Sequence, residues 1–211
     1  ECRARKGDAA AGGLVYLGVG VGLLVSSMLV IIPSDWLEGA QRWWPAFLLS
    51  VPLALWGWRQ IAQLEVTAPA AQYDAAGKAR DSKLLDRSST PLFLSYAGAG
   101  MGYILPMTFL PTLVRELQNM PEFLIGGSWL FVALATLPAP WIWNKVGQRM
   151  GDTAALRLNY ALQFMGVIAV LLMPNTTGVI LCAVLVGGTF LGTVLLSQRL
   201  ARALHPHQGP R

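Results

Sequence analysis

Six long apolar stretches limit what this chain can fold into. They lie near residues 9–32, 43–64, 91–114, 126–143, 155–174 and 177–198, and no residue in the middle of any of them is charged or a histidine. A helix needs about 20 mostly apolar residues to cross a hydrocarbon core of about 30 Å. Helices also satisfy their own backbone hydrogen bonds, as the bilayer core demands. The pattern predicts an all-α polytopic membrane protein with six transmembrane helices.

Composition agrees with a membrane protein. The 211 residues are 54% hydrophobic and 13% charged, whereas a soluble domain carries about 25% charge. The net charge of +5 raises the alternative of a nucleic-acid partner. The positive charges flank apolar segments instead of forming one patch with stacking aromatics. We therefore expect a lipid bilayer as the surroundings, and no nucleic acid.

The basic residues predict the orientation of these helices. Fourteen of the sixteen fall into four clusters, and a pair of apolar stretches separates each cluster from the next. The clusters are Arg3, Arg5 and Lys6; Arg59, Lys78, Arg80, Lys83 and Arg87; Lys145, Arg149 and Arg157; and Arg199, Arg202 and Arg211. Short loops rich in Lys and Arg stay on the cytoplasmic side. Both ends of the chain are therefore expected in the cytoplasm.

The longest polar segment divides the chain. Residues 60–90 show no sustained apolar period and carry mixed charge, which is typical of a solvated cytoplasmic linker. Two helices within 1–59 precede this linker, four helices within 91–204 follow it, and 205–211 form a tail. Since the first residue is Glu and the first apolar stretch begins abruptly, we expect the chain to be a piece of a longer protein.

Small residues recur four apart in three of the expected helices. The pairs are Gly18 and Gly22, Gly98 and Gly102, and Gly188 and Gly192. Such pairs let two helix backbones approach closely in lipid. Either they form sliding contacts in a moving protein, or they provide static packing.

Two prolines mark the stretch at 91–114. Pro106 and Pro111 each remove a backbone hydrogen bond and can kink the helix. In lipid, the freed carbonyls are tolerated only where neighbouring groups or a water-lined cavity satisfy them. The prolines predict either a gate in a bent helix or a kink that shapes packing near the outer end.

Polar groups in two stretches each follow one helical face. Tyr96, Gly100, Tyr103 and Met107 are spaced by four, three and four residues, and Thr189 and Thr193 share a face of the last stretch. These six residues are our candidates for a cavity that contacts a small organic substrate. The alternatives are an interfacial Tyr96, a Tyr103 that bonds a neighbouring helix, and threonines that bond the carbonyl one turn earlier.

Two segments resemble a known transporter family. The run from Tyr96 to Pro111, YAGAGMGYILPMTFLP, resembles the seventh transmembrane helix of the YbfB-type subfamily of the major facilitator superfamily (MFS). The run from Gly12 to Gly22, GGLVYLGVGVG, resembles the fifth. On this resemblance the chain covers the fifth to tenth of twelve helices, as the middle part of a transporter with two bundles, and residues 60–90 join its halves.

A third segment resembles the signature loop of the superfamily. Asn144, Lys145, Gly147 and Arg149 lie in the run NKVGQR, where the superfamily pattern is roughly Asp-Arg-x-Gly-Arg-Arg. In the superfamily this loop latches neighbouring helices on the cytoplasmic side. Here Asn144 replaces the acidic residue, which puts the strength of a charge latch in doubt, whereas Lys145, Gly147 and Arg149 match.

The resemblance implies secondary active transport of a small organic solute across the bacterial inner membrane by alternating access. Two bundles then rock around a site near the bilayer midplane, and the remaining helices of the transporter complete the pathway. The alternative is a membrane fragment or scaffold that does not transport. We expect no enzyme activity and no cofactor or metal, because the apolar stretches hold no carboxylate or His, and His205 and His207 lie in a Pro-flanked tail.

Overall fold

The computed structural model describes residues 2–31, 36–62, 87, 89–117 and 119–204, and all regular secondary structure in these ranges is helical. The helices are α1 (Cys2–Ile31), η2 (Gly39–Trp43), α2 (Trp44–Ala62), α3 (Thr90–Glu116), α4 (Glu122–Thr136), α5 (Ala139–Met150), α6 (Asp152–Leu172) and α7 (Thr176–Leu204). The expected linker lies almost entirely outside the described residues, and the tail at 205–211 lies wholly outside them.

An all-α fold is confirmed, and five of the six apolar stretches each form one helix close to the expected position. α1 begins at Cys2 rather than at residue 9, and α7 continues to Leu204 rather than ending at 198. Both extensions carry polar residues. A helix that has formed adds residues at little cost, so it can continue past its apolar stretch.

The expectation of one continuous helix over 126–143 is wrong. α4 ends at Thr136, and α5 begins at Ala139. The cause is the pair Pro138 and Pro140, which have no backbone N–H to give to the carbonyls of Leu134 and Thr136. Leu137 still donates to the Ala133 carbonyl at 3.1 Å and Ile142 to the Pro138 carbonyl at 3.0 Å, so each helix is regular up to the break.

Three described helices are long and apolar enough to cross a membrane, namely α3, α6 and α7. A shorter apolar stretch, Tyr16–Leu29, lies within α1. α4 and α5 have 15 and 12 residues, and each alone is shorter than the span of about 20 that a bilayer requires. The six-span topology is therefore only partly supported.

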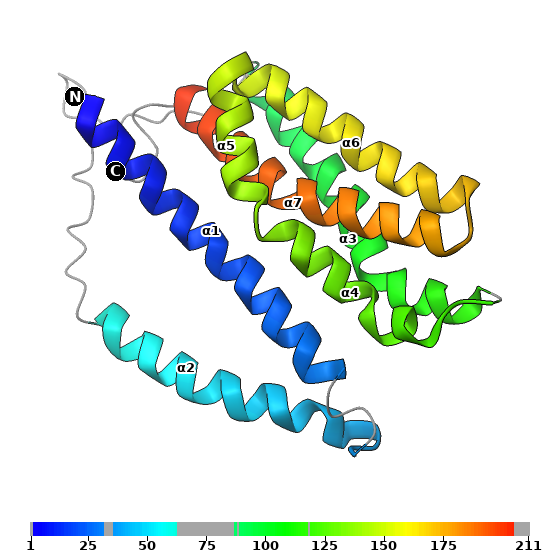
Figure 1. The fold of residues 1–211 in the computed structure, drawn as a ribbon. Coiled ribbons are helices and arrows are strands. Elements are labelled where there is room, and N and C mark those ends of the chain that lie inside the picture. The colour runs from blue at the N-terminus through cyan, green and yellow to red at the C-terminus, as the bar shows by residue number, and fades with distance from the viewer. Residues whose placement is uncertain (1, 32–35, 63–86, 88, 118, 205–211) are drawn as a thin grey trace.

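α7 is the central helix of the arrangement. It contacts α3, α4, α5 and α6, whereas α1 packs on α4 and α5 and α2 diverges from the rest (Figure 1). In the most apolar 18-residue stretch of α7, 56% of the residues are buried, whereas the corresponding share in α3 is 17%. One apolar core joins α3, α4, α6 and α7 around Val114 and Val186, and a second joins α5, α6 and α7 around Trp143 and Leu196.

The helix ends next to the basic clusters gather at one end of the bundle. The start of α1, the end of α2, the junction of α5 with α6 and the end of α7 lie on the same side in Figure 1. Arg42 and Arg115, in η2 and at the end of α3, belong to the opposite end. We call the first the basic end; it is the end that the charge pattern predicts to face the cytoplasm.

A close approach of α4 to α7 depends on Gly187. A Cβ built on this glycine would lie 2.5 Å from the Val132 carbonyl oxygen and 2.9 Å from the Val132 Cα. Both are backbone atoms of α4, which no side-chain rotation can move aside.

We predict that Gly187→Ala forces α4 away from α7 and lowers the free energy of unfolding by about 1–3 kcal/mol, the usual cost of overpacking. Gly188→Ala is the matched control, because its Cβ would meet only the Ala135 carbonyl oxygen, at 3.8 Å. Unfolding of the purified protein in mixed micelles measures both. Equal losses for the two variants would contradict this account of the α4–α7 contact.

Candidate functional site

Three successive carbonyls of α7 accept hydrogen bonds from three different helices. Thr136 Oγ1 of α4 shares its one proton between the Val132 oxygen of its own helix, at 2.8 Å, and the Gly187 oxygen, at 3.0 Å. Trp143 Nε1 of α5 lies 2.7 Å from the Gly188 oxygen, and Asn159 Nδ2 of α6 lies 2.9 Å from the Thr189 oxygen. A carbonyl has two lone pairs, so it can accept these bonds in addition to its helical one. This part of α7 therefore fixes the position of α4, α5 and α6 together.

A buried polar cluster continues from this point between α6 and α7. Thr193 Oγ1 donates to Asn159 Oδ1 at 2.6 Å and lies 3.4 Å from Gln163 Oε1. Asn159 and Thr193 are fully buried, and Gln163 is 5% exposed. A Cβ on Gly192 would lie 2.3 Å from the Trp143 ring and 2.5 Å from Asn159 Nδ2, so only glycine leaves room for both side chains.

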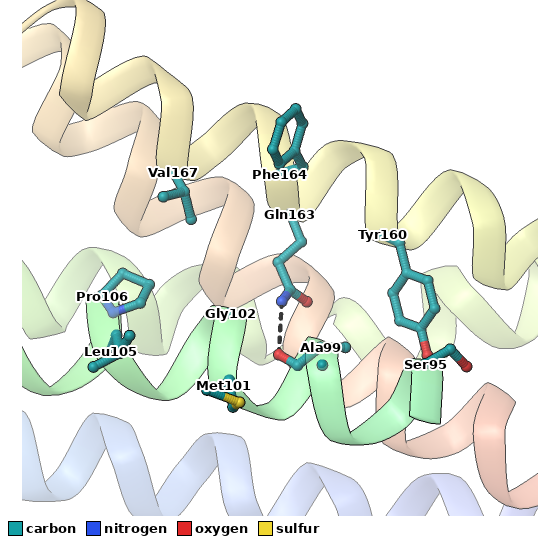
Figure 2. Close-up of a pocket in the computed structure, with 11 residues that line it drawn as sticks. Ser95, Ala99, Met101, Gly102, Leu105, Pro106, Tyr160, Gln163, Phe164 and Val167 are labelled. Carbon is teal, nitrogen blue, oxygen red and sulfur yellow. Dashed lines mark hydrogen bonds between the residues drawn. The ribbon is translucent and has the colours of Figure 1, made fainter. Parts of the chain in front are cut away.

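Gln163 connects this cluster to α3. Its Nε2 donates to the Ala99 carbonyl at 3.0 Å, and a Cβ on Gly102 would lie 3.2 Å from the same nitrogen. Figure 2 shows the Gln163 side chain reaching from α6 to the Ala99 oxygen. The small residues of α3 therefore let an amide from α6 reach its backbone.

A cavity of about 430 Å³ lies beside this bond, between α3 and α6. Its polar lining comes from Ser95, Tyr160 and Gln163, and its apolar lining includes Pro106 and Phe164. Tyr160 and Ser95 point toward each other across it (Figure 2), and the Tyr160 hydroxyl is buried with no hydrogen-bond partner among the described residues. Its residues offer uncharged hydrogen-bonding groups within apolar walls.

The tyrosines predicted from sequence lie on another face of α3. The Tyr103 ring packs against Phe190 of α7, with ring centroids 5.6 Å apart. Tyr96 is 37% exposed and is an electrostatic neighbour of both Tyr103 and Tyr16 of α1. Tyr16 donates a hydrogen bond from its hydroxyl to Gln198 Oε1 of α7. This tyrosine face (Tyr16, Tyr96 and Tyr103) thus draws on α1 and α3, and Tyr16 and Tyr103 each contact α7.

The remaining polar-face candidates have different surroundings. A Cβ on Gly100 would meet nothing within 4 Å, and Met107 packs against the first apolar core. Thr189 Oγ1 donates to the Leu185 carbonyl of its own helix at 2.7 Å, which is the local bond that is common for threonine in helices. Thr193 belongs to the buried cluster, as described above.

The paired glycines and prolines are unequal in their contacts. A Cβ on Gly18, Gly22 or Gly98 would meet nothing within 4 Å, whereas Gly102 and Gly192 lie against Gln163 and Asn159. Pro106 lines the α3–α6 cavity, and both Pro106 and Pro111 lie inside α3. Because Pro106 has no N–H for the Gly102 carbonyl, the helix loses a bond beside the cavity.

The signature-loop residues lie on α5 at the basic end. Asn144 Oδ1 accepts a hydrogen bond from an Arg199 guanidinium nitrogen at 3.0 Å, and the Lys145 ammonium lies 4.8 Å from the centre of the Trp141 ring. Arg149 is exposed, and Gly147 is buried against α6 and α7. The loop residues are therefore helical, and two of them contact the end of α7.

The family model described as uncharacterised MFS-type transporter YbfB matches residues 2–211. The chain belongs to this family of MFS transporters. Comparison with curated proteins and with solved structures found no match. Family membership confirms the resemblance found in the sequence and identifies a membrane transporter in general terms.

The polar groups between α6, α7 and α3 are uncharged amides and hydroxyls. Asn159 and Gln163 are not among the site residues that the sequence predicted, because neither is ionisable and neither lies on the tyrosine or threonine faces. Their signal was available: both are amides, four residues apart in an apolar stretch, and therefore on one helical face. Among the described residues, no group of three His, Cys, Asp or Glu is placed to hold a metal ion.

We predict that Thr193→Val in this MFS transporter destabilises the fold by about 1 kcal/mol, because it leaves the buried Asn159 oxygen without its donor. Thr189→Val is the control, since it removes only a bond within α7 and leaves the Thr189 carbonyl for Asn159. Steric trapping in bicelles measures both free energies. A Thr189→Val loss as large as that of Thr193→Val would count against the cluster as an interhelical link.

Proposed function

We propose that this protein carries a small organic solute across the bacterial inner membrane by secondary active transport with alternating access. The observation that supports transport most directly is the family match over residues 2–211. On the resemblance to the fifth to tenth helices, α1 and α2 belong to the first half of the transporter and α3 to α7 to the second. Further helices of the same transporter then complete the pathway.

The tyrosine face is our candidate for the solute contact. A solute that moves between two halves must touch residues of both, and this face combines Tyr16 of α1 with Tyr96 and Tyr103 of α3. Tyr and Phe rings offer flat apolar surfaces, and the phenol adds a hydrogen-bonding tip. The half-exposed position of Tyr96 leaves part of this surface free for a solute.

The hydrogen bond from Tyr16 to Gln198 is our candidate for an inner gate. It joins α1 to α7 near the basic end, and α1 also packs along α4 and α5. In alternating access, contacts between the halves at one end must break when the pathway opens at that end. One uncharged hydrogen bond suits that purpose, because its net contribution is modest.

We also propose that the basic end faces the cytoplasm, with both ends of the chain on that side. The charge clusters support this orientation, and the helix ends beside them gather on one side of the bundle (Figure 1).

We predict that Tyr103→Ala changes which solutes the intact protein transports, without preventing membrane insertion. Proteoliposomes assayed against a panel of radiolabelled sugars, amino acids and aromatic acids measure this, with an expected change of about tenfold or more for the best solute, as for a lost contact of about 1.4 kcal/mol. Tyr103→Phe keeps the ring and removes the hydroxyl, so it shows which of the two groups contacts the solute.

Tyr160→Phe is the matched control, because that tyrosine lines the α3–α6 cavity and not the tyrosine face. A changed solute profile in Tyr160→Phe together with an unchanged one in Tyr103→Ala would move the solute site to the α3–α6 cavity. Absence of transport for every solute would instead favour a membrane protein that does not transport.

Single cysteines are expected to report the orientation. In a background without Cys2 and Cys182, a cysteine at Gln148, exposed at the basic end, reacts with an impermeant maleimide only in inverted vesicles. A cysteine at Asn119, exposed at the opposite end, reacts only in intact spheroplasts. The reverse pattern would overturn the proposed orientation.

A further inference from the structure

Arg199 connects three helices at the basic end. One of its guanidinium nitrogens lies 3.2 Å from Asp152 Oδ1, at the start of α6. The other donates to Asn144 Oδ1 of α5 at 3.0 Å. The Arg199 and Asp152 side chains are 34% and 23% exposed, so water screens the ion pair less than it would screen a pair on an open surface. We call Asn144, Gly147, Asp152 and Arg199 the inner corner.

Gly147 makes this geometry possible. A Cβ at residue 147 would lie 2.7 Å from Asp152 Oδ1, 3.1 Å from the Leu196 side chain and 3.5 Å from the Arg199 guanidinium. The turn between α5 and α6 also depends on a glycine, because Gly151 has a φ of +84°, which side chains rarely adopt. The two glycines bring the first carboxylate of α6 over the end of α5.

Asp152 therefore supplies a charge that Asn144 lacks. The two residues contact different nitrogens of the same guanidinium, which can pair with a carboxylate and a neutral oxygen at once because it presents several donors in a fixed fork. Among the side chains that the structure describes, Asp152 is the only carboxylate at the basic end; Glu38, Glu116 and Glu122 lie at the other end. The amide at residue 144 then acts as a second acceptor.

The neighbouring residue of α7 makes a bond of the opposite kind. Gln198 accepts from Tyr16 of α1, across the two halves, whereas the partners of Arg199 among the described side chains, Asp152 and Asn144, belong to its own half. Two successive residues of one helix thus hold a charged link within a half and a neutral link between halves.

We propose that Arg199 is a positioning residue whose charge is balanced by Asp152, with the neutral Asn144 as its second acceptor, and that the inner corner stays closed while the Tyr16–Gln198 bond opens during transport. Arg199 and Asp152 lie within ion-pair distance but without hydrogen-bond geometry. The turn at Gly151 and the tight contact at Gly147 add to this ion pair in holding α5 against α6 and α7, so the three helices move together. The movement of α1 rests on the proposed function, but the assignment of Asp152 does not.

Exchanging the carboxylate and the amide tests the assignment. Asp152→Asn is expected to lower the Tm of the intact protein in detergent by about 2–4 °C. Adding Asn144→Asp to it is expected to restore at least half of that loss, because the new carboxylate stands at the position that already contacts Arg199. Restoration must disappear when Arg199→Gln is added. No loss in Asp152→Asn, or no restoration in the double variant, would overturn the assignment.

Distances between spin labels test the movement. In a background without Cys2 and Cys182, one label pair at Met150 and Ala201 reports the inner corner, and another at Val21 and Ala201 reports the two halves. In nanodiscs, Tyr16→Phe is expected to lengthen or broaden only the second distance, and Asp152→Asn to broaden the first. If Tyr16→Phe alters both distances or neither, α1 does not move independently of the corner. The result of the Asp152 and Asn144 exchange does not depend on this outcome and still tests the assignment of Asp152.

Discussion

The fold depends on a short stretch of α7 backbone that serves as a common acceptor. The carbonyls of Gly187, Gly188 and Thr189 bind side chains from α4, α5 and α6 in turn. In a bilayer, the hydrophobic effect does not favour one helix contact over another, so packing and hydrogen bonds decide which helices associate. Glycine at position 187 lets the α4 backbone come close enough for the first of these bonds. The other contacts of α7, including the close approach of Val132 and Trp143, follow from this arrangement.

The polar cluster of Asn159, Gln163 and Thr193 separates two apolar cores. Along α6, Leu156 belongs to the core near the basic end and Val170 to the other, with both amides between them. Buried amides without partners are costly in an apolar environment, so the α6–α7 pairing cannot shift by one turn without breaking these bonds. The polar layer therefore fixes the register of the two helices, and the apolar cores on either side supply area but little specificity.

The sequence predicted the helical fold and the family well, because apolar length and loop charge depend on local composition. The break at Pro138 was harder to predict. Each proline indicates a kink, but whether the chain continues as one helix depends on what packs on either side. Asn159 and Gln163 are uncharged and lie in a stretch with few other polar residues, so composition alone does not distinguish them from residues that face lipid or a neighbouring helix. Asp152 was harder still, since its relation to Asn144 exists only through the turn at Gly151 and the tight contact at Gly147.

The neutral chemistry of the layer between α6 and α7 has a consequence for how this protein tolerates its surroundings. Amides and hydroxyls of Asn, Gln and Thr do not titrate between acid and alkaline growth conditions. A change of pH on either side of the membrane therefore leaves the bonds from Thr193 to Asn159 and from Gln163 to Ala99 unchanged. Any response of this protein to pH must arise at groups outside that layer, and the helix pair can serve as a fixed frame against which such a response acts.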